Sequence, residues 1–149
     1  EESGGYDILA FTSTGSSLDN IQEQIELNDN LNLNDFGKID SGVRGFAPTK
    51  DYSGTYQIIG VNSKFVTNNS FGFVEYLDKY GSEKDVWNAV MNDPSLVISQ
   101  SAGLQFGMPT SEVNRLNSTT TIIDAYGRPS EKRIVGILNQ SILRGLFMS

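Results

Sequence analysis

Carboxylates are the side chains best placed for acid–base chemistry in this sequence, because histidine and cysteine are both absent. Paired carboxylates cleave glycosidic bonds, so a cluster of them is the first candidate for an active site. The cluster here consists of Asp78, Glu83, Asp85 and Asp93. These residues lie near the two ends of a predicted helix, where acidic side chains cap the helix and form turns. We therefore interpret them as structural, and we predict that the chain is not an enzyme.

The missing residue types exclude several further kinds of site. Without cysteine or histidine there can be no Cys/His zinc site, thiol redox pair, cysteine nucleophile or Ser-His-Asp triad. A Walker-type nucleotide loop, with its Gly-Lys step and hydroxyl residue, is also absent. We predict no catalytic residues, no cofactor and no metal ligands, and we expect any ATPase that serves this chain to lie on another chain or domain.

The charge of the chain points away from nucleic acid. Asp and Glu number 18 against 11 Lys and Arg, which gives a net charge of −7. Phosphates require a basic surface, and anionic lipid headgroups attract basic segments in the same way. We predict no nucleic-acid partner and no attachment to a membrane by charge alone. Solubility is the simplest role of the acidic surface, and attraction of cationic peptides or drugs is the alternative.

An aromatic cluster in the middle of the chain has two readings, a ligand-binding patch or part of the core. Its members are Phe71, Phe73, Tyr76, Leu77 and Tyr80, with Trp87 further on. We favour the core, because the spacing is helical and the cluster adjoins a capped helix. That helix begins at Ser82, which pairs with Asp85, and ends at Asn92-Asp93-Pro94. Its apolar stripe is Val86, Trp87, Val90 and Met91.

The elements before this helix form a β-α-β-β pattern. Alternating apolar residues predict a strand over Tyr6–Thr12, and the polar turn at Ser16 predicts a helix that ends near Asn28. Two strands follow, over Phe36–Ala47 and Thr55–Thr67, and the second is dense in β-branched and aromatic residues. We expect the helix of this unit to cover one face of its sheet.

The elements after the helix are mostly strands. A short buried strand is predicted over Leu96–Ser99 and a single helical turn over Ser101–Phe106. A hairpin follows, in which Thr119–Asp124 and Arg133–Leu138 flank a turn at Tyr126–Pro129. The last strand is the more apolar of the two and should face the core.

These elements predict one α+β domain over residues 1–149, a mixed two-lobed domain with a β-α-β-β lobe and a smaller β-rich lobe. The lobes would be residues 1–107, mainly α/β, and residues 108–149, β-rich. No apolar run approaches the ~20 residues that cross a bilayer. The sequence starts at Glu1 without Met and ends at Ser149, and we expect it to be cut from between flanking segments.

Several segments, in this order, resemble the extracytoplasmic domain of MacB-like and FtsX-like ABC transporter permeases. They are Gly4-Gly5-Tyr6-Asp7-Ile8 at the start, Val86-Trp87-Asn88-Ala89-Val90, Asp93-Pro94, Leu96-Val97-Ile98-Ser99 and Ala102–Gly107 in the middle, and Lys132–Leu138 near the end. The order of the segments is more specific than any one of them. One departure is the absence of a Gly-Asp step soon after Gly107, where Met108-Pro109 stands instead, which implies a remodelled smaller lobe.

The resemblance implies a non-catalytic domain on the extracytoplasmic face of the cell membrane, held by flanking transmembrane helices that this sequence lacks. It implies a separate or fused ABC ATPase subunit, a permease homodimer or heterodimer, and peptide, lipoprotein or drug cargo or a cell-wall hydrolase as partner. The domain would transmit ATP-driven conformational change, dock cargo or a partner, and have both termini near one end. The alternative is the extracellular ligand-binding or sensing domain of a membrane receptor such as a sensor kinase.

Overall fold

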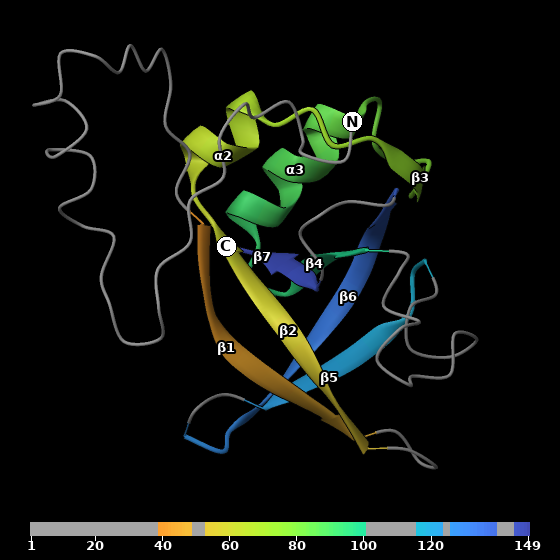
Figure 1. Ribbon diagram of the computed structural model, residues 1–149. Helices are drawn as coiled ribbons and strands as arrows, with labels where there is room; N and C mark the ends of the chain where they lie inside the picture. The colour runs from red at the N-terminus through yellow and green to blue at the C-terminus, as the bar shows by residue number, and fades with distance from the viewer. Residues whose placement is uncertain (1–38, 49–52, 101–115, 124–125, 140–144) are drawn as a thin grey trace, which may run out of the picture.

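The computed structural model describes residues 39–48, 53–100, 116–123, 126–139 and 145–149 (Figure 1). The predicted strand at Tyr6–Thr12, the helix from Ser16 to Asn28 and the turn at Ser101–Phe106 lie outside these residues. The elements within them are β1 (Ile39–Pro48), β2 (Ser53–Val61), α2 (Ser63–Asn68), β3 (Phe73–Tyr76), α3 (Glu83–Asn92), β4 (Leu96–Gln100), β5 (Thr119–Ile123), β6 (Pro129–Leu138) and β7 (Leu146–Met148).

All the described strands belong to one mixed sheet. The order of the strands is β1-β2-β7-β4-β6-β3. The long strand β6 pairs with β5 along its first half and with β3 near its end. Three-residue β7 runs parallel to β2 and antiparallel to β4, and β4 runs parallel to β6. The α+β prediction is confirmed. The separation into two lobes at residue 107 is not seen among the described residues, because β6 and β7 lie in the same sheet as β2 and β4.

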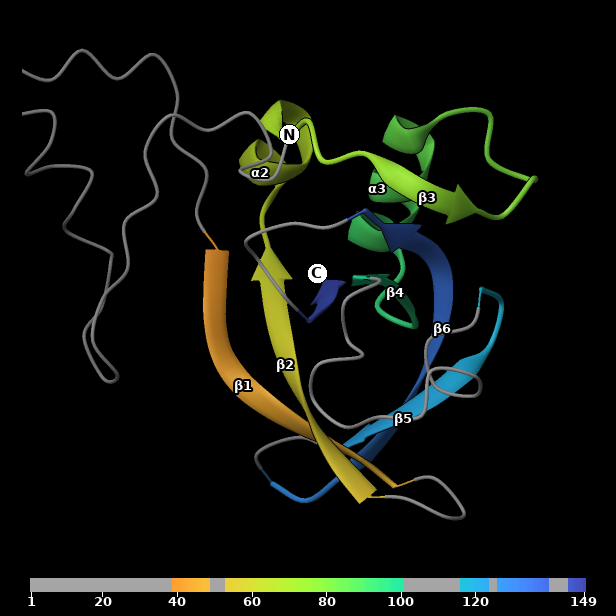
Figure 2. The same ribbon diagram turned by 45° about the vertical axis from the view of Figure 1, so that its right-hand side comes forward.

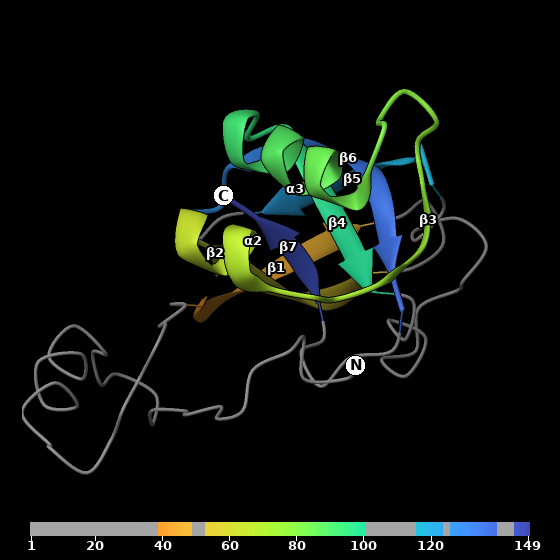
Figure 3. The ribbon, with the colours of Figure 1, turned by 90° about the horizontal axis from the view of Figure 1, so that it is seen from above.

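The sheet is covered differently on its two faces. Neighbouring residues of a strand point to opposite faces, and Ile59, Ile98 and Phe147 pack with the helices while their neighbours Ile58, Val97 and Leu146 form a second cluster. Seen from above, α2 and α3 lie together over β7 and β4 (Figure 3). The long strands bend away from the helices until β1 comes close to β5 at the far end (Figure 2).

A β-bulge in β6 shapes the helix-side face. Val97 of β4 is opposite Ile134 and Ile98 is opposite Gly136, so Val135 is the extra residue. A Cβ atom on Gly136 would lie 2.5 Å from Cε1 of Phe73 and 3.2 Å from Cγ1 of Val86. A side chain at position 136 would therefore press on the Phe73 ring where that ring crosses β6.

The strand predicted over Thr55–Thr67 is wrong in its second half. The extended segment ends with β2 at Val61, and α2 begins two residues later. Asn62 is the N-cap, and its Oδ1 accepts a hydrogen bond from the backbone N–H of Phe65 at 2.8 Å. The apolar run continues through the boundary because Phe65 and Val66 are buried from the helix.

Among the described residues, the later predictions hold with one exception. The helix after Ser82, the strand at Leu96 and the hairpin of β5 and β6 are confirmed. The exception is the helical conformation inferred from the spacing of the aromatic cluster. That inference is wrong, because Phe73–Tyr76 is strand β3 on the edge of the sheet. Tertiary pairing with β6 overrides the local pattern there.

Candidate functional site

The three carboxylates nearest the start of α3 are spread over helix-capping positions and an exposed loop. Ser82 is the N-cap, and its Oγ accepts from the Asp85 backbone N–H at 3.3 Å and donates to Asp85 Oδ2 at 2.8 Å. Glu83 Oε1 accepts from the Phe73 backbone N–H at 3.2 Å, which ties the start of the helix to β3. Asp78 is exposed in the loop between them. The predicted position of Glu83 and Asp85 at the start of a helix is confirmed.

Asp93 has a comparable role at the other end of α3. It is the C-cap residue, and its Oδ1 accepts from the Ser95 hydroxyl at 2.6 Å and from the Ser95 backbone N–H at 2.9 Å. These two hydrogen bonds, the hydroxyl first, lower the pKa of Asp93 below its ordinary value. The same two hydrogen bonds fix the turn that leads from α3 into β4.

Lys132 is the buried basic residue of the described chain, with 8% of its surface exposed. Its Nζ donates to the backbone carbonyl oxygen of Pro94 at 2.5 Å, which links β6 to the turn between α3 and β4. Burial lowers the pKa of Lys132, and the nearby charge of Asp93 acts in the opposite direction. The amine thus holds the turn between α3 and β4 against β6.

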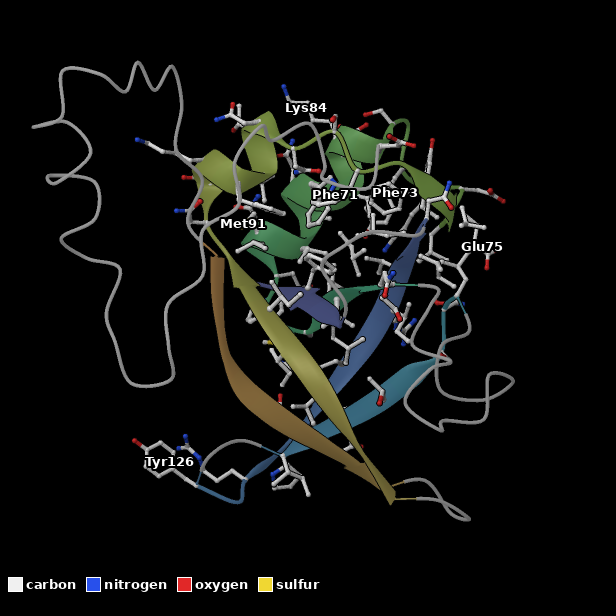
Figure 4. All side chains as sticks on the ribbon, viewed as in Figure 1. Phe71, Phe73, Glu75, Lys84, Met91 and Tyr126 are labelled. Atoms are coloured by element: carbon white, nitrogen blue, oxygen red, sulfur yellow. The ribbon has the colours of Figure 1, made fainter. Side chains whose placement is uncertain are left out.

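The aromatic cluster proves to be core. Phe71 and Trp87 are buried, and the other members pack against the same cluster with part of their surface exposed. The Trp87 ring meets Phe65 edge-on at 5.7 Å between centroids and Phe147 at 5.8 Å. Figure 4 shows this crowded region between the helices and the sheet, with Phe71 and Phe73 labelled.

Two of the most buried rings escaped the sequence analysis. Phe65 lies in a segment predicted to be a strand and no element is predicted at Phe147, yet both rings are fully buried. The apolar run Leu146-Phe147-Met148 was the available signal, and three residues are too few for periodicity to reveal a strand.

Among residues 39–48, 53–100, 116–123, 126–139 and 145–149, no group of three or more Asp or Glu could hold a metal ion. Within the same ranges no helix is long and apolar enough to cross a membrane. That the chain has no catalytic, cofactor or metal-binding residues stays a prediction.

No family model and no curated protein matches the sequence. The fold is similar to that of the extracellular domain of the noncanonic ABC-type transporter YknZ from Gram-positive bacteria, with a TM-score of 0.44 and 11% sequence identity. The match covers 74% of this chain and 50% of that one, so the chain spans about half of the length of that domain.

Proposed function

We propose that this chain is an extracytoplasmic domain of an ABC transporter permease. In this role it transmits ATP-driven conformational change, docks cargo or a partner protein, and carries out no bond chemistry. The ATPase is a separate or fused subunit, the permease forms a homodimer or heterodimer, and flanking transmembrane helices hold the domain on the outer face of the cell membrane.

The observation that carries the proposal is where the family-like segments lie in the fold. Val86–Val90 lies in α3 and includes its buried residues Val86, Trp87 and Val90, Leu96–Ser99 is most of β4, and Lys132–Leu138 is most of β6. These segments are far apart in sequence, yet α3 packs on β4 and β4 pairs in parallel with β6. The resemblance therefore concerns residues that build one contiguous unit at the centre of the sheet, which favours shared ancestry over chance similarity of short strings.

The chemistry of the described surface supports a role without catalysis. Glu83, Asp85 and Asp93 are engaged in capping and turn hydrogen bonds. The sheet is packed on both faces by apolar side chains, so it can move as a stiff body when one end is displaced. Stiffness is what a domain needs to pass on a movement or to present a docking surface.

Membrane placement is tested by labelling single cysteines in the full-length protein in intact cells. The chain contains no cysteine of its own, so each introduced thiol reports one site. Ser130→Cys is exposed on β6 and should react with a membrane-impermeant maleimide without permeabilisation. The control, Ser99→Cys, is buried in β4 and should react only after denaturation.

The same cells distinguish the permease from a receptor. We expect the full-length protein to co-purify with an ABC ATPase, or to contain one, and to cross the membrane several times. Labelling of Ser130→Cys only after permeabilisation would overturn the extracytoplasmic placement. A kinase module in the same polypeptide would instead establish the sensor alternative.

A further inference from the structure

The corner between α3 and β4 has little apolar packing of its own. Val90 is the last buried residue of α3, and Val97 is the first buried residue of β4. Each of the six residues between them is exposed or half-buried, although Met91 and Leu96 pack partly against the cluster between the helices and the sheet. The conformation of residues 91–96 therefore depends mainly on hydrogen bonds.

The end of α3 also lacks a local positive charge. Carbonyl groups at the C-terminal end of a helix carry partial negative charge, which a basic side chain in the last turn can offset. The last turn of α3 contains no basic residue, and its C-cap is the acidic Asp93. A compensating cation can therefore come only from elsewhere in the fold.

The compensating cation is Lys132 of β6, which is 38 residues along the chain from Pro94. The hydrogen bond from its Nζ to the Pro94 carbonyl oxygen is made by a side chain with only 8% of its surface exposed. Burial disfavours the charged amine, and attraction to Asp93 favours it. The backbone N–H of Arg133 donates to the carbonyl oxygen of Ser95 at 2.8 Å. Two adjacent residues of β6 thus hold two adjacent residues of the turn.

The same stretch of β6 is anchored separately to the start of β5. The backbone N–H of Ile134 donates to the Ser118 carbonyl oxygen at 3.0 Å, and that of Asn117 donates to the Ile134 carbonyl oxygen at 2.8 Å. Strand β6 pairs with β3 further along. Strand β6 is therefore a fixed support, against which Lys132 and Arg133 hold the corner.

We propose that the hydrogen bond from Lys132 to Pro94 is a releasable lock on the end of α3. When it breaks, residues 91–96 open away from β6 as a unit, and the buried residues of α3 keep the rest of the helix in place. Lysine suits this role, because its flexible stem lets the strongly hydrated amine return to water and recover the free energy that burial costs. The inference rests on the bonds of the corner and not on the permease assignment. It identifies a place where α3 can move while the sheet stays intact.

Native-state hydrogen exchange of the 149-residue chain, followed by NMR at increasing urea concentration, tests the proposal. The reporters are the backbone N–H groups of Asp93, Leu96 and Arg133, which bond to the carbonyl groups of Ala89, Asp93 and Ser95. Their exchange should depend less on urea than that of the slowest amides of β2, because a local opening exposes little surface. The same urea dependence and opening free energy for both sets would show that the corner opens only with the whole fold, and would overturn the proposal.

A substitution of Lys132 tests whether its amine is the lock. Lys132→Met keeps a buried apolar stem and removes the amine, so exchange of the three reporters should become about tenfold faster or more. Exchange of Asn117 and Ile134, whose N–H groups bond β5 to β6, should not change. Lys79→Met is the matched control, because Lys79 also acts on Asp93 through its charge but is exposed. It should leave all five amides unchanged.

Two outcomes with these variants contradict the role of Lys132. Unchanged reporters in Lys132→Met would show that the amine does not hold the corner. Faster exchange of Asn117 and Ile134 together with the reporters would show that β6 itself leaves the sheet. If Lys132→Met does not fold, the urea series on the native chain decides whether the corner opens by itself. A failure of cysteine labelling in cells would leave all these outcomes untouched.

Discussion

The two faces of the sheet are filled by different kinds of side chain. The helix-side cluster contains the rings of Phe65, Phe71, Trp87 and Phe147. The buried residues of the opposite cluster are all aliphatic: Ile58, Val97, Ile122, Ile134, Ile137 and Leu146. Large rings suit the wide gap between helices and a sheet, whereas branched aliphatic residues suit a bent sheet whose strands approach one another. The helices are thus held on the sheet by aromatic packing, whereas the opposite face is filled by aliphatic residues.

Strand β7 allows the two faces to be compared at neighbouring residues. Phe147→Ala should lower the free energy of unfolding by about 3–5 kcal/mol, and Leu146→Ala by about 2–5 kcal/mol. We expect the larger loss for Phe147, because three rings contact it. Urea unfolding followed by tryptophan fluorescence measures both. Equal losses would mean that the aromatic face is no more tightly packed than the aliphatic one.

A methyl group at Gly136 tests the close packing of the helix side. Gly136→Ala places a Cβ against Phe73, and relief of the overlap should cost about 1–3 kcal/mol. In the background of Phe73→Ala the same substitution should cost much less, since the obstructing ring is gone. A double-mutant cycle by urea unfolding gives the coupling. Additive effects would show that Phe73 does not press on β6.

The smallest expected effect concerns pH at the end of α3. The pKa of Asp93 is lowered in the folded chain from its ordinary 3.8 by the hydrogen bonds from Ser95. Its contribution is therefore present above the unfolded pKa and is lost as pH falls through the folded pKa. Asp93→Asn should lower the thermal midpoint slightly at neutral pH and flatten its fall below about pH 4. An acid profile identical to that of the native chain would contradict this role.

Sequence reasoning succeeded where a local signal agreed with the tertiary structure. Ser82 and Asp85 marked the start of α3, and the apolar run Ile134–Leu138 marked β6. It failed at Asn62, because the apolar residues on both sides of this helix N-cap read as one continuous strand. It also failed at Phe73, because pairing with the distant strand β6 makes this segment extended. The pattern of polar residues at helix ends identified the capping carboxylates correctly. No local pattern could reveal that Leu146 and Phe147 occupy the middle of the sheet.

That central position has a consequence for biosynthesis. The β1–β2 hairpin and the α3–β4 unit leave the ribosome well before β7, the last described strand, which joins them. Until then β2 and β4 each lack a hydrogen-bonded neighbour, and their open edges can pair wrongly with other chains. Closure also requires contact between residues far apart in sequence, which slows folding. The interval between synthesis of β4 and of β7 is therefore the period in which a nascent chain would gain most from a chaperone.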